Sequence, residues 1–472
     1  MTSPAAARAA SAVLLRRRPS RVPHSPRFPS TPRPVPPSFF FEGRISAATT
    51  LARPFSVSAD RFTSGAGGSS IPVEKDDLGE QLQKYSLRRQ TSVSLETLMA
   101  TGRGEYLHRT GHDAESASRG DESEATLQIL MQVASFLRRE LPIRLAHRVR
   151  DLEDVPVLHD MPSVRQVKDC YVRSFEDIVK APPVQDAAGE EEFAALLEEI
   201  YERHAGVLVM MARGAFELRK GIRDGTYDAS GAAGGSGSKQ MDFEQMSDMH
   251  AFLDRFYLSR IGIRMLIGQY LSLRQPEVSN YIGIISTRTS AYEIVRQATD
   301  DATFMCARKY GDAPEVIISG RLDMTFPYVP THLHYIMLEL IKNSMRATVE
   351  WHGVDSDYPP IRVIIADGNE NEDVVVKVSD EGGGIPRSYM ERIWSYLFTT
   401  ADPAIQEGMV AFGEDNDHSI DSPLAGLGYG LPISRAYARY FGGEVSIMSM
   451  EGFGTDAFVY LTRLGKSREP LP

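Results

Sequence analysis

One stretch decides the fold, residues 374–386, which read Val374-Val-Val-Lys-Val-Ser-Asp380-Glu-Gly382-Gly383-Gly384-Ile385-Pro386. Its β-branched residues predict a strand that delivers an aspartate into a triple-glycine turn. Glycines let the backbone come close to a flat ligand, and three of them are more than a hairpin turn needs. Asp380 is therefore placed to accept a hydrogen bond from an exocyclic amine such as adenine N6, worth about 1.5–3 kcal/mol.

A helix is predicted for residues 331–351, in which Glu339, Asn343 and Arg346 occupy positions i, i+4 and i+7. This spacing places the three side chains on one face. The Asn343 carbonyl oxygen can be a ligand of Mg²⁺, a cation that usually binds phosphates and only a few protein groups. Glu339 can accept a proton. On its own, such a helix is more often an amphipathic surface helix.

Two more glycine stretches follow. The first, Gly426-Leu-Gly428-Tyr-Gly430-Leu-Pro432, leads into a helix expected at residues 431–441. A glycine loop that opens a helix offers free N–H groups and the positive dipole end to phosphates. The second, Gly452-Phe-Gly454-Thr455, precedes the last expected strand, where the Thr455 hydroxyl can face a base. A plain turn is the simpler interpretation of that segment in isolation.

Around these motifs the C-terminal half alternates strand-like and helical patterns, which predicts an α/β sandwich with helices on one face of a sheet. The expected strands are residues 315–319, 361–366, 374–378, 444–450 and 456–461, and the expected helices are 290–310, 331–351 and 431–441. The acidic, glycine-punctuated segment 401–425 is expected to close over the ligand as a lid, with a disordered insertion as the alternative.

The preceding region is helical in pattern, with helices expected at residues 127–152, 164–179, 191–217 and 246–273. Four such helices suggest an antiparallel four-helix bundle. Pro142 is expected to break or kink the first helix. The glycine- and serine-rich segment 221–239 is expected to be a surface loop, and most of residues 59–126 to be weakly ordered.

An arginine-rich leader precedes all of this. Residues 1–58 hold nine arginines, no lysine and one acid, so they carry +8 of a net charge of −11 and leave −19 on the remainder. This composition is typical of an organelle transit peptide, and Arg53-Pro-Phe-Ser-Val-Ser58 resembles a mitochondrial processing site. A disordered basic arm is the alternative interpretation.

Composition excludes several other classes. The 472 residues are 42% hydrophobic and 24% charged, which fits packed domains rather than a fibrous or wholly disordered chain. Cys170 and Cys306 provide neither a disulfide framework nor a thiolate metal cluster. The negative charge argues against a nucleic-acid partner, and no apolar stretch reaches the ~20 residues that membrane insertion needs. Neither a P-loop nor the HRD and DFG motifs of typical protein kinases are present.

In order, spacing and element type, the four motifs resemble the N box and the three glycine boxes of the GHKL ATPase superfamily, which includes the histidine kinases. The helix at residues 252–267 lacks the phospho-accepting histidine of that group. It instead resembles the mitochondrial pyruvate dehydrogenase kinases, as do residues 139–146, 328–335 (Tyr328-Val-Pro-Thr-His-Leu-His-Tyr335), 339–347, 396–400 and 423–443.

This resemblance implies an α+β chain in which an N-terminal antiparallel four-helix bundle is followed by a GHKL α/β sandwich. The implied order is a mitochondrial transit peptide (1–58), a largely flexible segment (59–126), a regulatory and docking bundle (127–278), an ATP-binding kinase domain (284–465) and a C-terminal tail (466–472). The implied activity is a serine/threonine kinase that uses Mg–ATP to phosphorylate, and so inactivate, the decarboxylating α subunit of the pyruvate dehydrogenase complex.

Residue roles carry over by the same resemblance. Glu339 is implied as the general base and Asn343 as the Mg²⁺ ligand. His334 is a candidate to polarise Glu339 or a surface histidine, because the place of the assisting histidine of several animal members is occupied by Tyr335. The residues implied to contact ATP are Glu339, Leu340, Ile341, Lys342, Asn343, Ser344, Met345, Arg346, Asp380, Gly382, Gly384, Thr399, Thr400, Gly426, Leu427, Gly428, Tyr429, Gly430, Leu431 and Thr455.

The implied partners are the α subunit as substrate, the lipoyl domain of the dihydrolipoyl acyltransferase core, and a second copy in a homodimer, all in the mitochondrial matrix. A close alternative is the branched-chain 2-oxoacid dehydrogenase kinase. An alternative from another class is a nucleotide-binding regulatory scaffold without transfer activity, against which the intact Glu339, Asn343 and Asp380 argue.

Overall fold

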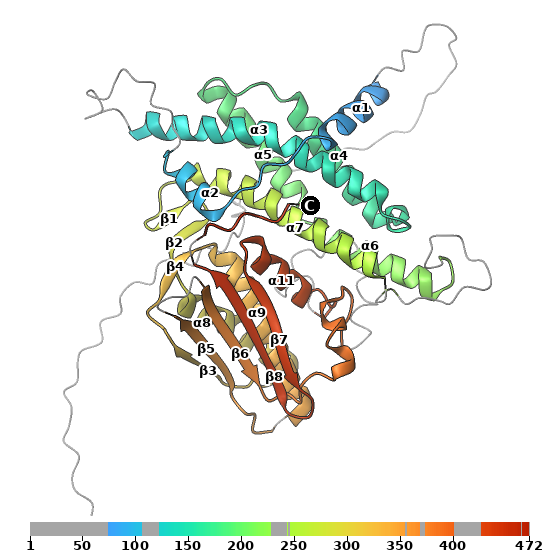
Figure 1. The fold of residues 1–472 in the computed structure, drawn as a ribbon, viewed down its shortest axis with the longest axis vertical. Coiled ribbons are helices and arrows are strands. Elements are labelled where there is room, and N and C mark those ends of the chain that lie inside the picture. Colours follow the sequence, from blue (N-terminus) through green and yellow to red (C-terminus); the bar gives the residue numbers. More distant parts are fainter. Residues whose placement is uncertain are drawn as a thin grey trace, which may run out of the picture. The chain divides into compact units, whose positions relative to one another are not determined.

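The computed structural model describes residues 74–105, 122–227, 243, 246–354, 356–368, 373–400, 426–463 and 465–471. Every described residue belongs to one compact unit, Ile71–Pro472. This unit is α+β, as expected, with helices in its N-terminal part and a mixed sheet in its C-terminal part (Figure 1). The leader, most of the glycine-rich loop and the expected lid lie outside the described residues.

The N-terminal part consists of helices that contribute buried apolar residues to the core. They are α1 (Glu74–Ser86), α2 (Leu95–Gly102), α3 (Glu122–Asp154), the 3-10 turn η1 (Leu158–Asp160), α4 (Pro162–Lys180), α5 (Ala187–Arg203), α6 (Val207–Arg223) and α7 (Ser247–Leu273). Helix α3 packs on α4 and α7, α4 packs on α6, and α5 packs on α7. None of the helices in the described part of the chain is long and apolar enough to cross a membrane.

Three expectations for this part differ from the structure. Residues 191–217 form not one helix but parts of α5 and α6, so the described residues between 122 and 273 form five long helices rather than four. The chain turns at His204-Ala205-Gly206, where glycine disfavours a continuing helix and Arg260 donates to the carbonyl oxygens of His204 and Ala205, each at 3.3 Å.

Of the break or kink expected at Pro142, the break does not occur: α3 continues through this residue, with Leu141 and Leu145 buried on either side. Helices α1 and α2 form within the segment 59–126 that was expected to be largely weakly ordered. Ser94 caps α2 by accepting a hydrogen bond from the Thr97 N–H at 3.1 Å, and Leu95, Leu98 and Met99 are buried.

The C-terminal part is built on a five-stranded mixed sheet with the order β3-β5-β6-β8-β7. Its strands are β3 (Val316–Gly320), β5 (Ile361–Asp367), β6 (Asp373–Asp380), β7 (Glu444–Met450) and β8 (Gly454–Thr462). The β3–β5 pair is parallel and the other pairs are antiparallel. A separate small sheet, which the sequence did not predict, contains β1 (Tyr281–Ile282), β2 (Ile285–Ser290) and β4 (Thr325–Tyr328).

Helices α8 (Ala291–Tyr310), α9 (Pro330–His352) and α11 (Gly430–Tyr440) pack on the sheet and on one another (Figure 1). Strand side chains alternate between two faces, and the face beneath these helices is buried through residues such as Val376, Val459 and Ile365. The expectation of helices on one face of a sheet is therefore confirmed. The other face leaves Ile364 and Met448 exposed.

Candidate nucleotide and phosphoryl-transfer site

Helix α9 carries the first part of the site. Glu339 lies in the middle of this helix and is only 4% exposed. Lys342, one turn later, donates from Nζ to Oε1 of Glu339 at 2.6 Å. A buried carboxylate of this kind needs a partner, and the ammonium group provides it while fixing the direction of the side chain.

The start of helix α11 lies against Glu339. A side chain at position 430 would collide with Oε2 of Glu339, so any residue other than Gly430 would have to displace this carboxylate. Gly430 is also the first residue of α11. The expected glycine-to-helix motif therefore brings free backbone N–H groups and a positive dipole end next to the candidate base.

Asp380 forms the opposite end of the site, at the end of strand β6. Its Oδ2 accepts a hydrogen bond from the Ser344 hydroxyl at 2.7 Å. Its Oδ1 accepts from the N–H groups of Gly382 at 3.0 Å and Thr455 at 3.2 Å, the latter because Asp380 and Thr455 are register partners on β6 and β8. Three elements thus hold this carboxylate in one orientation.

Burial raises the pKa of Asp380 above its usual range, and the hydrogen bonds from Ser344, Gly382 and Thr455 act in the opposite direction by stabilising the charged form. Asp380 is 8% exposed. Each carboxylate oxygen retains acceptor capacity beyond these three donors. A planar base with an exocyclic amine could therefore bind at the accessible edge of this side chain.

Helix α9 carries two more polar side chains of the expected site. The Asn343 side chain makes no hydrogen bond with any described residue, so its carboxamide oxygen is available to a ligand, and a hard cation such as Mg²⁺ suits that donor. Arg346 donates from Nη2 to the Thr400 hydroxyl at 2.9 Å, which ties α9 to the segment that precedes the expected lid.

The loop before α11 is shaped by a second glycine. Gly428 has φ = 82°, and a side chain there would collide with the carbonyl oxygen of Phe398. The next residue, Tyr429, is buried and packs edge-on against Tyr257 of α7, with ring centroids 6.0 Å apart. Leu427 is also buried, so the backbone of this loop, rather than these side chains, faces the site.

Comparisons with known proteins agree with this geometry. Residues 116–286 match the family model of mitochondrial branched-chain alpha-ketoacid dehydrogenase kinase, and residues 328–464 match that of histidine kinase-, DNA gyrase B-, and HSP90-like ATPases. A relative from Arabidopsis thaliana named [pyruvate dehydrogenase (acetyl-transferring)] kinase, mitochondrial, is 45% identical over 400 residues, which cover 83% of this chain and 96% of the relative. This chain belongs to the mitochondrial pyruvate dehydrogenase kinase family.

Relatives with the same name occur in other organisms. The one from Schizosaccharomyces pombe is 37% identical over 72% of this chain and 91% of the relative. The one from Drosophila melanogaster is 40% identical over 71% of this chain and 79% of the relative. The resemblance to the pyruvate dehydrogenase kinases drawn from the motifs is confirmed.

The described side-chain contact of His334 is with helix α8. Its Nε2 lies 2.9 Å from Oδ2 of Asp301 on α8, and the described contacts of Glu339 do not include it. Tyr335, one turn before Glu339, packs on Tyr437 of α11 with ring centroids 5.1 Å apart. Burial, and then the nearby Glu339 charge, raises the pKa of Tyr335 well above its usual value.

The other residues that the family resemblance implied to contact ATP fall into two groups. Gly382, Gly384, Thr399, Gly426 and Leu431 lie on the turns and helix start that frame the site. Leu340, Ile341 and Met345 are instead buried in the hydrophobic core, so their side chains support α9. The Thr455 hydroxyl lies 3.1 Å from that of Ser449, and only its N–H reaches Asp380.

Several residues that shape the site in this kinase family member escaped the sequence reasoning. Tyr396, before the two threonines, is bound by His250 and Asp254 of α7. Their i, i+4 spacing places two polar side chains on one face of α7, and this is the pattern that could have indicated them. The sequence offers no comparable pattern for Arg219 of α6, which donates to the Leu397 carbonyl oxygen.

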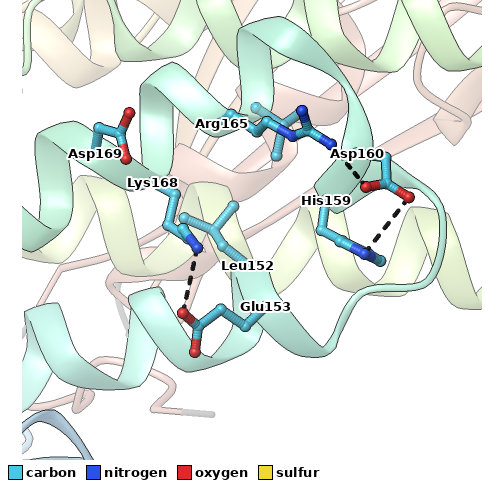
Figure 2. A pocket seen from close by; sticks show the side chains of 8 residues that line it. Leu152, Glu153, His159, Asp160, Arg165, Lys168 and Asp169 are labelled. Atoms are coloured by element: carbon cyan, nitrogen blue, oxygen red, sulfur yellow. Dashed lines mark hydrogen bonds and ion pairs between the residues drawn. The ribbon is translucent and has the colours of Figure 1, made fainter. Parts of the chain in front are cut away.

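A hollow of about 440 Å³ lies elsewhere, between α3, η1 and α4. Figure 2 shows that its charged side chains pair mostly with one another: Lys168 with Glu153 at 3.3 Å, and Arg165 with Asp160 at 2.9 Å. None of the expected site residues lines it. It is separate from the nucleotide site.

Proposed function

We propose that this chain is a serine/threonine kinase that transfers the γ-phosphoryl group of ATP to serine on the decarboxylating α subunit of the pyruvate dehydrogenase complex and so inactivates that complex. One observation carries the proposal: the Glu339 carboxylate lies against the first residue of α11. A base next to a helix N-terminus suited to phosphates is the arrangement that phosphoryl transfer to a hydroxyl requires.

The nucleotide would lie between the two ends of the site. Asp380 would accept a hydrogen bond from the adenine amine, since Ser344 and two backbone N–H groups already hold its carboxylate in place. The N–H groups at the start of α11 would bind the phosphate oxygens. The nucleotide would also be contacted by Thr399 and Thr400 of the segment 396–400 and by Arg346 of α9.

Glu339 would accept the proton of the substrate serine hydroxyl as that oxygen attacks the γ-phosphorus. A general base of this kind typically contributes about 10²–10⁴-fold to the rate. Lys342 fixes Oε1, which leaves Oε2 on the side of Gly430, where the phosphate would be. His334, held by Asp301, is the candidate to polarise Glu339, and its substitution by Asn is expected to change the transfer rate only a few-fold.

Asn343 would hold Mg²⁺, because its carboxamide has no partner among the described residues and lies one turn after Glu339. When bound, the cation neutralises phosphate charge. Asn343→Ala is accordingly expected to weaken Mg–ATP binding more than binding of the metal-free nucleotide.

A branched-chain 2-oxoacid dehydrogenase kinase is the second candidate, because the family model that matches residues 116–286 bears that description. The test is to incubate the purified protein and radiolabelled ATP with the pyruvate and the branched-chain complexes side by side. Label on the pyruvate complex alone is the expected result, and label on the branched-chain complex alone would transfer the proposal to that substrate. Absence of label on both would leave the scaffold interpretation.

Two variants test the site. Glu339→Gln is expected to bind ATP and lose most transfer, and Asp380→Ala is expected to lose nucleotide binding. The matched control is Glu293→Gln, an exposed carboxylate on α8. Normal activity in either site variant would overturn the assignment of that residue.

The family and one exposed surface support two proposals about how the chain assembles with partners. We propose that the helical part, which the sequence suggested to be a four-helix regulatory and docking domain, binds the lipoyl domain of the acyltransferase core. We also propose a homodimer through the uncovered sheet face, which is supported by the exposure of Met448, Met450 and Ile364. Retention of the protein on immobilised lipoyl domain, but not on its unlipoylated form, tests the first of these.

The mitochondrial matrix is the proposed location. The relatives are named as mitochondrial, and residues 1–58 have the composition of a transit peptide. N-terminal sequencing of the native protein is expected to begin near residue 59. Retention of residues before Arg53 would contradict this proposal.

A further inference from the structure

The segment that carries Thr399 and Thr400 is held by the helical part of the chain. It begins at Tyr396, which is fully buried. The Tyr396 N–H donates to Nδ1 of His250 at 3.3 Å, and its hydroxyl donates to Oδ1 of Asp254 at 2.7 Å. The His250 and Tyr396 rings also stack, with centroids 6.2 Å apart. Helix α7 therefore fixes the residue at which this segment begins.

The next residue, Leu397, has an uncommon backbone conformation. Its φ of 65° lies in the left-handed region, which a leucine rarely adopts without help from its surroundings. Arg219 of α6 donates from Nη1 to the Leu397 carbonyl oxygen at 3.2 Å, and both residues are buried. A hydrogen bond from a buried guanidinium is charge-assisted and therefore strong. The Arg219 guanidinium also lies 5.0 Å from the Phe216 ring centroid, which fixes its direction.

The backbone at Leu397 and Phe398 also contacts the glycine loop that precedes α11. Gly428 rests on the carbonyl groups of Leu397 and Phe398 so closely that no side chain would fit. Thr400, two residues after Phe398, accepts a hydrogen bond from Arg346 of α9. A rotation of the Leu397 peptide out of the left-handed region would therefore displace the loop that opens α11 and the two threonines together.

We propose that Arg219 is a positioning residue for nucleotide binding: by holding Leu397 in the left-handed conformation, it sets the surface on which Gly428 rests and the place of Thr399 and Thr400. This inference rests on the proposed function, because it concerns the same nucleotide site. It assigns part of that site to α6, so a ligand or partner that moves α6 changes nucleotide affinity.

The test compares Arg219→Met with the double variant Arg219→Met/Leu397→Gly. Methionine keeps an apolar stem on Phe216 and removes the donor. Its affinity for Mg–ADP, measured by calorimetry, is expected to fall about tenfold, and the KM for ATP is expected to rise by the same factor while kcat changes less. Glycine adopts φ = 65° without strain, so the double variant is expected to recover part of the lost affinity.

If Arg219 had only a structural role, the order of the two variants in nucleotide affinity would be reversed. The loss of the Leu397 side chain leaves a buried cavity, so the double variant would then be both less stable and a weaker binder than Arg219→Met. The matched control is Arg223→Met, an exposed position on the same helix, which is expected to bind like the unmodified protein.

The inference about Arg219 and the proposed function are contradicted by different results. Unchanged affinity in Arg219→Met, or no recovery in the double variant, would overturn this inference. Failure of the unmodified protein to bind Mg–ADP would overturn the proposed function instead.

Discussion

Glu469 and Arg144 form a buried ion pair that joins the C-terminal segment to helix α3. Nη1 of Arg144 donates to Oε2 of Glu469 at 3.1 Å, and Nη2 donates to Oε1. The Tyr440 hydroxyl at the end of α11 donates to the same Oε2 at 2.7 Å. The Val93 N–H, between α1 and α2, donates to Oε1 at 3.1 Å. One carboxylate therefore holds three segments that are distant in the sequence.

Glu469→Gln is expected to lower the free energy of unfolding by about 3 kcal/mol, the lower end of the range for breaking a buried pair, because Arg144 keeps its second partner Glu140 at 3.0 Å. Urea denaturation followed by circular dichroism measures this change. The control is Lys466→Gln, an exposed residue of the same segment, for which a change within about 0.5 kcal/mol is expected. Equal midpoints for the two variants would show that the pair does not stabilise the fold.

Ser344→Ala is expected to weaken nucleotide binding about tenfold. The Ser344 hydroxyl donates to the buried carboxylate of Asp380 at 2.7 Å, and its loss leaves Oδ2 without a donor from the part of the chain that the structure describes. Calorimetry with Mg–ADP measures the effect. Ser356→Ala is the control, because the Ser356 hydroxyl donates to the His352 carbonyl oxygen and does not reach Asp380. If both variants bind alike, Asp380 does not depend on this hydroxyl.

Gly428→Ala is expected to reduce nucleotide affinity far more than Gly452→Ala. The two glycines have nearly the same φ, 82° and 83°, so both variants carry a similar backbone penalty of about 1 kcal/mol. Only position 428 lacks space, because a methyl group there would collide with the Phe398 carbonyl oxygen, whereas position 452 is open. Equal losses of affinity would mean that the contact between the two segments is unimportant for binding.

Acid is expected to destabilise the fold through His204. Burial, together with the charges of Arg260, Arg203 and Arg264, lowers the pKa of His204 from 6.5 to about 3. The unfolded chain therefore binds a proton near pH 6.5 and the folded chain does not until about pH 3, so stability falls as the pH drops between these values. The slope from this group is at most about 1.4 kcal/mol per pH unit.

The measurement is the free energy of unfolding at pH 7.5 and pH 5.0 for the unmodified protein and for His204→Gln. Glutamine can retain the hydrogen bond of Nε2 to the Ser174 hydroxyl, which is 2.9 Å long. The variant is expected to lose less stability between the two pH values. Identical pH dependence in both proteins would remove His204 as the cause.

Met448→Asp is expected to convert the proposed homodimer to monomers. Met448 is 64% exposed on the uncovered sheet face, and a charge there would have to be desolvated on association. Sedimentation equilibrium gives the mass. Phe304→Asp is the matched control, because Phe304 is 60% exposed but lies on α8, away from that face. A dimer that resists the first substitution, or dissociates with the second, would locate the interface elsewhere.

The local sequence pattern was sufficient to predict the elements that carry the site. The alternation at residues 444–450 predicted β7 with its observed bounds, and the glycines after Asp380 and before α11 predicted two turns that bring backbone close to the site. Both depend on residues adjacent in the sequence, so the sequence displays them directly.

Long-range partners were not predictable in the same way. Arg219 and Leu397 are 178 positions apart, and neither residue type signals the other. The turn at His204–Gly206 was missed for a related reason: buried positions recur on both sides of it, at Ile200 and Val207, so the periodicity runs on while Arg260 of another helix binds the exposed carbonyl groups.

The strand order has a consequence for how the chain is made. Strand β8 is the last strand in the sequence among those described, yet it pairs between β6 and β7 in the interior of the sheet. The sheet therefore cannot close until residues 454–462 have left the ribosome, and Glu469 completes its ion pair with Arg144 later still. The contacts that complete the sheet and this ion pair therefore form late in folding, because they join residues that are distant in the sequence.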